Sequence, residues 1–333
     1  MDFILLGLFP GMKHADILTT VIIVIYVAAL TGNSTLILLI LVDSQLHTPM
    51  YFLLSQLSLI DLLLISTIVP KMTTDFLLEK KNISNTGCGT QMFLYRMLGG
   101  AECILLTLVS WDRYVAICYP LRYPVIMNQR VCLMMVLGSW AGGALNALVQ
   151  TAYTMNLPMC GPKELEHFFC EIMAVLSFSF RDTSAHKLAI LVTGIVLLLI
   201  PFVIIFSSYS LIFFTVLHMN SPKGRNKALA TCSSHLMVLS FFYGPAIFTY
   251  MTPGSSHSPS QDKAVSVFFS IITPTLNPFI YSLRNKDVLG ALRKTLLPAP
   301  RSSLGCRTLR SVLGEQPPPP PPPSALPTSG LIR

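Results

Sequence analysis

Charged residues are scarce in this chain. Lysine, arginine, aspartate and glutamate together make up 11% of its 333 residues, whereas 52% of the residues are hydrophobic. A soluble domain normally carries about a quarter charged residues. This shortage of charge excludes an ordinary soluble domain and indicates a membrane protein.

The motifs of several enzyme and repeat-protein classes are also missing. The sequence has no Gly-x-Ser-x-Gly motif, no metal-binding cluster of histidines, and no Cys/His spacing that suggests zinc. No repeat of the solenoid type is visible. Residues 3–9 are apolar but too short to span a membrane, and they lack the basic segment and cleavage site of a signal peptide. We therefore expect no signal peptide, and an intramembrane enzyme is a remote alternative.

Long apolar stretches are abundant instead, and a helix needs about 20 such residues to cross a bilayer. Seven stretches qualify, at about 17–41, 49–72, 90–120, 131–150, 187–217, 227–251 and 264–283. Basic residues gather after the third, fifth and seventh stretch, for example Lys223, Arg225 and Lys227. Because such residues mark the cytoplasmic side, we expect an extracellular N-terminus and a cytoplasmic C-terminus. These basic residues on the cytoplasmic side account for much of the net charge of +8. We therefore expect no nucleic-acid partner.

These stretches predict an all-α membrane protein with one seven-transmembrane helix bundle over residues 1–297. Residues 285–296 place apolar side chains on one helical face and basic ones on the other, so we expect a short amphipathic helix on the lipid of the inner leaflet. A disordered, Pro-rich cytoplasmic tail should follow over residues 298–333. Its proline run, Pro317 to Pro323, is extended and is more often a spacer than a ligand for proline-binding domains.

A buried polar layer is predicted halfway across the bilayer. At 1.5 Å per residue, Asp61 lies about 17 Å from the inner start of the second stretch, and Glu102 about 18 Å from the outer start of the third. Asn33 and Asn277 fall near the same level. Acids at this depth must face the bundle interior and meet partners. The layer either holds a cation, most simply Na⁺ with water, or contains one protonated acid that bonds to the other without an ion.

The third stretch ends in the triplet Asp112, Arg113 and Tyr114. Arg113 either snorkels to the membrane surface or is a switch, held by Asp112 at rest and freed to meet an intracellular partner. The inner end of the sixth stretch, residues 225–229, offers no carboxylate that would hold Arg113. Asp112 is therefore the expected resting partner of the arginine.

Two later stretches combine a proline with a tyrosine near the inner end. Asn277 and Pro278 precede Tyr281, and Pro201 precedes Tyr209. Proline inside a helix removes a hydrogen bond and produces a kink. These kinks are either structural or, as we favour beside a buried asparagine, hinges that bring Tyr209 and Tyr281 towards Arg113.

Three cysteines fall on the outer side, at Cys88, Cys160 and Cys170, so one disulfide and one remaining thiol are expected there. Asn82 begins a glycosylation sequon in an outer loop, so it is a candidate for glycosylation. Cys306 in the tail is a candidate for palmitoylation, although it is more simply unmodified.

The outer half of the bundle is the expected ligand site, with an apolar wall and few polar points. The candidate lining residues are Tyr95, Arg96, Gly99, Gly100, Cys103, Thr193, Leu197, Tyr243, Ala246, Ile247 and Tyr250. The two glycines either make room for a ligand or allow close helix packing. Arg96 snorkels outward, pairs with Glu171, or binds an acceptor group of a ligand.

Four segments together resemble the vertebrate olfactory receptors of the tetrapod-type class II branch, which are rhodopsin-like G-protein-coupled receptors. The resemblance runs from about residue 3 to 296, and its segments are residues 49–58, 112–118, 227–235 and 274–285. It implies a plasma-membrane protein that binds odorants between the third, fifth, sixth and seventh stretches. It also implies coupling to a stimulatory olfactory G protein that raises cyclic AMP.

The resemblance further implies roles for particular residues. It implies a disulfide between Cys88 and Cys170 and a sodium-type site at Asp61 and Glu102. Switch roles are implied for Arg113, Tyr209, Tyr243, Asn277 and Tyr281. It implies no organic cofactor and no catalytic residue.

This chain departs from the family pattern at several positions. No glycosylation sequon precedes the first stretch, Phe180 stands where a cysteine that would pair with Cys160 is expected, and Trp111 replaces a common tyrosine. The alternatives to a working receptor are a transporter, which the seven unlike stretches argue against, and a receptor-like chain that folds poorly and does not signal.

Overall fold

The structure is a computed structural model that describes residues 2–8, 15–78, 81–159, 164–251 and 259–296. The chain divides into two compact units, Met1–Ala291 and Leu292–Arg333. The description below concerns the first unit. The predicted tail, residues 298–333, and Cys306 lie outside the described residues.

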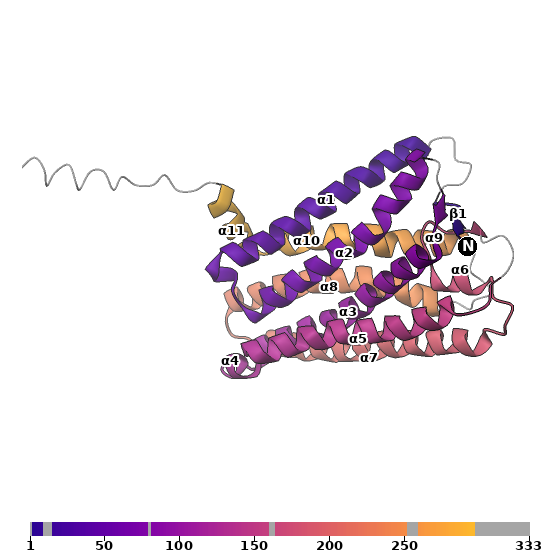
Figure 1. Cartoon of the computed structure of the whole chain (residues 1–333). Helices are drawn as coiled ribbons and strands as arrows, with labels where there is room; N and C mark the ends of the chain where they lie inside the picture. The colour runs from indigo at the N-terminus through magenta and orange to yellow at the C-terminus, as the bar shows by residue number, and fades with distance from the viewer. Residues whose placement is uncertain (1, 9–14, 79–80, 160–163, 252–258, 297–333) are drawn as a thin grey trace, which may run out of the picture. The chain divides into compact units, whose positions relative to one another are not determined.

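Long helices make up the first unit and run side by side (Figure 1). They are α1 (Ala15–Val42), α2 (Pro49–Leu78), α3 (Asn85–Cys118), α5 (Gln129–Met155), α7 (Ser184–Leu217), α8 (Pro222–Met251) and a continuous segment of α9 (Pro259–Val267), the π-helical η3 (Phe268–Ile272) and α10 (Thr273–Arg284). Within the described residues, every one of these except α8 meets the length and composition needed to cross a membrane. The arrangement matches the predicted seven-helix bundle.

Several helices are longer than the apolar stretches that predicted them. α2 continues to Leu78 rather than ending near residue 72, and α5 covers Gln129–Met155 rather than 131–150. Hydropathy marks the part of a helix that lies in lipid, whereas capping side chains set its ends. α3 begins where the Ser84 hydroxyl accepts a hydrogen bond from the Gly87 N–H at 3.0 Å, and Asn128 caps α5 in the same way.

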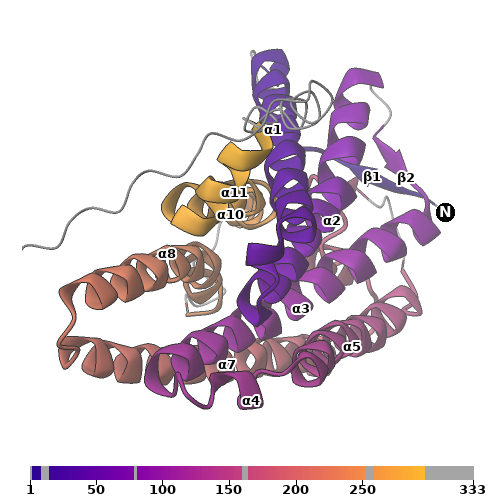
Figure 2. The same cartoon turned by 90° about the vertical axis from the view of Figure 1, so that its left-hand side faces the viewer.

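The packing of the helices places α3 at the centre of the unit. α3 contacts α2, α5 and α7, while α1 contacts α2 and α10. α8 lies between α7 and α10, as the turned view shows (Figure 2). Side chains on α3 therefore reach most of the other long helices.

Three short strands cover one end of the bundle. β1 (Phe3–Leu5) pairs antiparallel with β2 (Asn82–Ile83) and parallel with β3 (Glu164–Leu165), so the order is β2-β1-β3. Phe3 and Leu5 are buried against Leu165 and the half-cystines Cys88 and Cys170. We call this end the disulfide end. From the sequence we concluded only that the apolar segment 3–9 is too short to span a membrane. The small sheet was therefore not predicted.

The opposite end, which we call the α4 end, carries the short helix α4 (Tyr123–Ile126) between α3 and α5. α11 (Lys286–Leu296) follows α10 after Asn285, close to the predicted range of 285–296. The remaining short helices are η1 (Ser44–Leu46) and α6 (Ile172–Leu176).

Candidate functional site

The predicted polar layer lies in the middle of the bundle. Asp61 on α2, Glu102 on α3 and Asn277 on α10 are each at most 3% exposed. The Asn277 side-chain amide donates to both carboxylate oxygens of Asp61, at 3.2 and 3.1 Å. The buried acid Asp61 therefore has a neutral hydrogen-bond donor on another helix, as an acid in the middle of a membrane requires.

Asn33 on α1 joins this layer for a different reason. Pro278 has no N–H, so the carbonyl of Pro274, four residues earlier, loses its helical partner. The Asn33 amide donates to that carbonyl at 3.0 Å and to the Ala29 carbonyl at 3.1 Å. The sequence predicted the level of Asn33 correctly. Its partner could also have been predicted, because Pro278 leaves the Pro274 carbonyl without a helical N–H donor.

Several buried oxygens near this layer have no hydrogen-bond partner. They are Asn33 Oδ1, Thr273 Oγ1, Asn277 Oδ1 and Tyr281 Oη. Neutral and carboxylate oxygens are what a hard cation prefers as ligands. No group of three or more His, Cys, Asp or Glu side chains suited to a metal occurs in the described part of the chain. The sodium-type site implied for Asp61 and Glu102 stays a prediction.

The Asp112–Arg113 pair expected at the end of α3 is present. Arg113 Nη2 donates to Asp112 Oδ2 at 3.0 Å, and the Asp112 side chain is fully buried. The second carboxylate oxygen accepts from the Tyr123 hydroxyl of α4 at 2.7 Å. Burial, followed by the field of Asp112, raises the pKa of the Tyr123 phenol, so this group stays a proton donor. No pattern in the sequence had indicated Tyr123 as a partner of Asp112.

A cavity of about 30 Å³ opens beside Arg113 at the α4 end, with room for about two water molecules. Its lining residues are Met50, Leu54, Val109, Arg113, Ser234, His235, Tyr281 and Asn285. Tyr209 of α7 hydrogen-bonds to His235 Nδ1 of α8. Arg113 and Tyr281 thus line one cavity, and Tyr209 reaches it through His235.

Three residues of the predicted ligand site meet next to the polar layer, because Cys103 directly follows Glu102 on α3. The Cys103 thiol of α3 donates to the Leu197 carbonyl of α7 at 2.8 Å and lies 3.4 Å from the Tyr243 hydroxyl of α8. Tyr95, two turns before Cys103, packs its ring against Phe169 with centroids 4.7 Å apart. α3, α7 and α8 are therefore joined at the level where a ligand was expected.

The two adjacent glycines of α3 face different neighbours. A Cβ atom on Gly99 would lie 3.7 Å from the Phe269 ring, on the side of the seventh helix. A Cβ on Gly100 would lie 3.3 Å from the Gly143 Cα of α5. Gly100 is therefore at a close helix contact, whereas Gly99 remains on the face predicted to meet a ligand.

The other predicted lining residues are placed as follows. The Thr193 hydroxyl donates to the Ala189 carbonyl of its own helix at 2.7 Å. The side chains of Ala246, Ile247 and Tyr250 lie outside the described part of the structure. Nothing in the geometry of these four residues tests the ligand site.

Arg96 does not form the ion pair with Glu171 that was one of its alternatives. The ion pairs within the described ranges are Lys71–Asp75 and Asp112–Arg113. The Glu171 carboxylate instead caps α6 by accepting from the Ala174 N–H at 2.8 Å. Burial raises the pKa of Glu171, and the Ala174 N–H and the charge of Arg96 oppose that rise. Arg96 Nε is buried without a hydrogen-bond partner.

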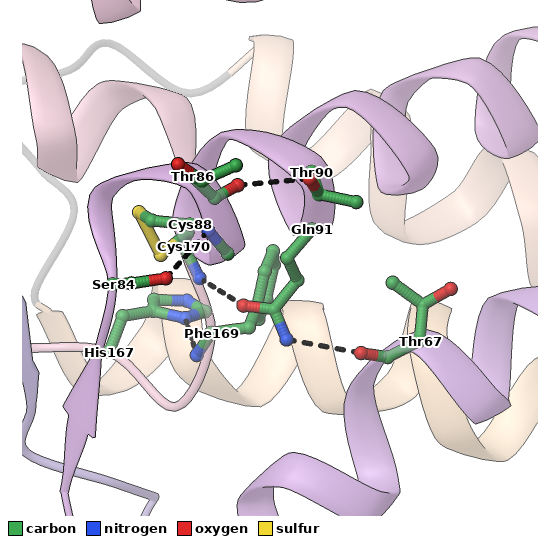
Figure 3. The surroundings of a disulfide bond; sticks show 10 residues. Thr67, Ser84, Thr86, Cys88, Thr90, Gln91, His167, Phe169 and Cys170 are labelled. Atoms are coloured by element: carbon green, nitrogen blue, oxygen red, sulfur yellow. Dashed lines mark hydrogen bonds between the residues drawn. A yellow bond between two sulfur atoms is a disulfide. The ribbon is translucent and has the colours of Figure 1, made fainter.

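The disulfide implied by the family resemblance is formed between Cys88 and Cys170 (Figure 3). Gln91, one turn along α3, accepts from the Cys170 N–H at 2.9 Å and donates to the Thr67 carbonyl of α2 at 3.1 Å. The loop is thus attached to α3 by a covalent bond and to α2 through an amide. Cys160 lies outside the described residues.

His167 lies beside this disulfide with its ring stacked on Phe168. Burial, and then the positive charge of Lys263, lower the pKa of His167 from 6.5 to about 4. The imidazole is therefore neutral at physiological pH, and its Nδ1 accepts from the Phe169 N–H at 3.4 Å.

Three positions noted in the sequence lie at the surface. Trp111 is 39% exposed beside Tyr114, and Phe180 is 70% exposed. Met159 and Ser179 form an isolated antiparallel bridge, so the segment that leads to Cys160 runs beside the one that leads to Phe180. The Asn82 side chain is exposed on β2.

Comparison with known proteins shows which family of sequences this chain resembles. A sequence model described as olfactory receptor matches residues 22–298. The human olfactory receptor 2T27 is 53% identical over 295 residues, which cover 89% of this chain and 93% of that protein. Human olfactory receptors 2T5 and 2L3 are 53% and 49% identical, cover 89% and 88% of this chain, and are each matched over 94% of their own length.

Proposed function

Because this chain belongs to the olfactory receptor family, we propose that it binds small, mostly apolar odorants in the half of the bundle towards the disulfide end and activates a stimulatory G protein that raises cyclic AMP. Odorant recognition and G-protein coupling in general follow from membership of this rhodopsin-like receptor family, as does a multi-pass position in the plasma membrane. Membership of this family also argues against the transporter and enzyme alternatives, because the members of the family are receptors.

The contacts around Cys103 carry the proposed location of the ligand. The Cys103 thiol, the Leu197 carbonyl and the Tyr243 hydroxyl bring α3, α7 and α8 to one point. Tyr95 and Phe269 supply aromatic surface, with centroids 6.2 Å apart, and Gly99 leaves space beside Phe269. An apolar wall with a few polar groups is what a small, mostly apolar ligand needs.

The residues at the α4 end support a switch. Asp112 and Tyr123 hold Arg113, while Tyr209 and His235 join α7 to α8 beside the same cavity. A ligand that favours another arrangement of these helices would release Arg113 towards a G protein by shifting an existing equilibrium. In this proposal Asn277, Pro278 and Tyr281 form the hinge of the seventh helix.

The polar layer would hold a sodium ion in the resting receptor. Asp61 and Glu102 supply the negative charge, and the unpartnered side-chain oxygens of Asn33 and Asn277 supply neutral ligands. The ion would offset the cost of burying two acids at mid-membrane.

The disulfide end is proposed to face the cell exterior, because disulfides persist in oxidising surroundings and basic residues concentrate at the other end. Glycosylation of Asn82 would report this orientation. We expect glycosidase treatment to shift the mobility of the wild-type receptor, and we expect the Asn82→Gln variant to lack that shift. Wild-type and variant proteins with the same mobility would remove this support for the orientation. Asn33 also begins a sequon, but its side chain is buried, so Asn33→Gln is the matched control and should leave the shift intact.

The experiment that tests the function measures cyclic AMP in cells that co-express this receptor and a stimulatory olfactory G protein, over a broad odorant panel. We expect at least one odorant to raise cyclic AMP, and Arg113→Ala to abolish the rise at equal surface staining. Arg130→Ala, which removes an exposed arginine at the start of α5, is the matched control and should keep the response.

Three results would contradict the proposal. A response that persists in Arg113→Ala would exclude the proposed switch. A receptor at the surface that raises no cyclic AMP over the whole panel would argue against stimulatory coupling, and a chain that never reaches the surface would support the receptor-like alternative that does not signal.

A further inference from the structure

Three buried polar atoms without a hydrogen-bond partner belong to residues that line the cavity at the α4 end. They are Arg113 Nε on α3, His235 Nε2 on α8 and Tyr281 Oη on α10. The side chains of His235 and Tyr281 are buried, at 3% and 6% exposure. A buried polar group that is left unpaired costs free energy. Three such groups around one cavity therefore point to a ligand that satisfies them together.

Each of the three groups is a hydrogen-bond donor. Arg113 Nε always carries a proton, and the guanidinium is positively charged. The buried Tyr209 hydroxyl bonds to His235 Nδ1. We assign the phenol as the donor in this bond, because Tyr209 then keeps its proton paired, and the ring proton of His235 is consequently on Nε2. Tyr281 contributes an O–H.

The other polar groups that line the cavity already have partners. The Ser234 hydroxyl donates to the Ala230 carbonyl at 3.2 Å. The Asn285 amide donates to the Tyr51 hydroxyl at 2.9 Å, and its carbonyl oxygen accepts from the Asp287 N–H at 2.9 Å. The remaining lining residues are apolar: Met50, Leu54 and Val109. Among the residues that the structure describes, the cavity thus offers free donors and no carboxylate.

The acid next to Arg113 does not satisfy these donors. Asp112 accepts from Arg113 Nη2 with one carboxylate oxygen and from the Tyr123 hydroxyl with the other. This leaves the Nε–H of Arg113 for another acceptor. The acceptor has to come from outside the side chains described so far.

We propose that this cavity binds a small monovalent anion, and that the anion is chloride. A cavity with room for about two water molecules admits chloride and is too small for sulfate or phosphate with their four oxygens. Hydrogen bonds from Arg113 to an anion are charge-assisted and therefore stronger than neutral ones. Water is the competing occupant, but water also donates two protons, and these lining side chains offer no free carbonyl or carboxylate oxygen to accept them.

Bound chloride would connect three helices, because its donors lie on α3, α8 and α10. A partner that takes Arg113 would have to displace the anion, so chloride would favour the resting arrangement. This consequence for coupling rests on the function proposed above. The anion site itself does not depend on that function.

Thermal unfolding of the purified full-length receptor in nanodiscs tests the site. Chloride is titrated against gluconate, an anion too large for the cavity, at constant ionic strength. Sodium is also held constant, because Asp61 bonds to Asn277, one turn before Tyr281, and is part of the proposed cation site. Chloride should raise the melting temperature in a saturable way, by about 3 °C at ten times its dissociation constant.

Two variants remove one donor each. Tyr281→Phe lacks only the hydroxyl, and His235→Phe lacks the imidazole; in both, the shift caused by chloride should fall below about 1 °C. Each variant is compared with itself in the two anions, so a general loss of stability does not affect the result. Tyr153→Phe is the matched control and should keep the full shift, because Tyr153 is exposed on α5 and does not line the cavity.

Chlorine NMR measures binding without unfolding the receptor. The wild-type receptor should broaden the chloride signal, whereas Tyr281→Phe should broaden it no more than nanodiscs without receptor. Equal melting temperatures of the wild type in chloride and gluconate would mean that the cavity holds water only, and the proposal would be wrong. A full shift retained in both Tyr281→Phe and His235→Phe would place the anion elsewhere and would equally overturn it. A receptor that binds chloride but activates no G protein would contradict the proposed function and not the anion site.

Discussion

Replacing Gly143 by alanine is expected to destabilise the receptor by about 3 kcal/mol, at the upper end of the cost of overpacking. A Cβ atom at this position would lie 2.5 Å from the Met97 carbonyl oxygen and 2.8 Å from the Ala101 nitrogen of α3. Both neighbours are backbone atoms of a helix, so they move only if α3 and α5 separate. Thermal unfolding of the purified receptor, followed by fluorescence or circular dichroism, measures the loss.

Two other glycines of α5 provide graded controls. A Cβ on Gly138 would meet nothing within 4 Å, so Gly138→Ala should be neutral or stabilise the helix by up to about 1 kcal/mol. A Cβ on Gly142 would lie 3.2 Å from the end of the flexible Ile104 side chain, so Gly142→Ala should fall between the other two. Equal stabilities for the three variants would show that the α3–α5 contact is looser than described here.

Removing the disulfide is the second change with a large expected effect. Cys88 and Cys170 are separated by 82 residues, and the chain-entropy relation gives about 4.5 kcal/mol for a loop of that length. The double variant Cys88→Ser/Cys170→Ser should therefore lose most of its surface staining and unfold at a clearly lower temperature. The loss reaches beyond the loop, because Cys88 and Cys170 also pack against Phe3 and Leu5 of β1.

A reducing agent separates the bond from the packing of the two side chains. Reductant should lower the melting temperature of the wild-type receptor and leave that of the double variant unchanged. A wild-type receptor that melts at the same temperature with and without reductant would contradict this account of the disulfide.

The sequence predicted those features that depend on one helix at a time. Hydropathy located the seven helices, and the depth of Asp61 along its own helix was enough to predict that it needs a buried partner. Asn277 was placed at the same level, but its bond to Asp61 was not predicted, because the alternatives considered were a cation and a bond between the two acids.

Contacts that depend on the rotation of two helices about their axes could not be predicted in this way. The bond from Tyr123 to Asp112 and the bond between Tyr209 and His235 require the relative orientation of neighbouring helices. The same limit explains the glycines of α3: Gly99 and Gly100 are adjacent in sequence, yet they turn towards different helices.

Residue charges alone could not choose among the three alternatives for Arg96. A pair with Glu171 was one of them, but Glu171 Oε2 accepts from the Ala174 N–H at the start of α6. A helix N-terminus attracts an acid as a cation does, and the local partner lies three residues away, whereas Arg96 lies on another element. Short-range capping therefore outcompetes the ion pair.

The sheet at the disulfide end has a consequence for the order of assembly. Residues 3–5 are synthesised before their partners, because Ile83 follows α2 and Leu165 follows α5. Contacts between positions so far apart in the chain form slowly, because much of the chain must be arranged before they can close. Residues 3–5 are thus made early but are among the last to reach their places, so a tag fused beside them would interfere with a late step of folding.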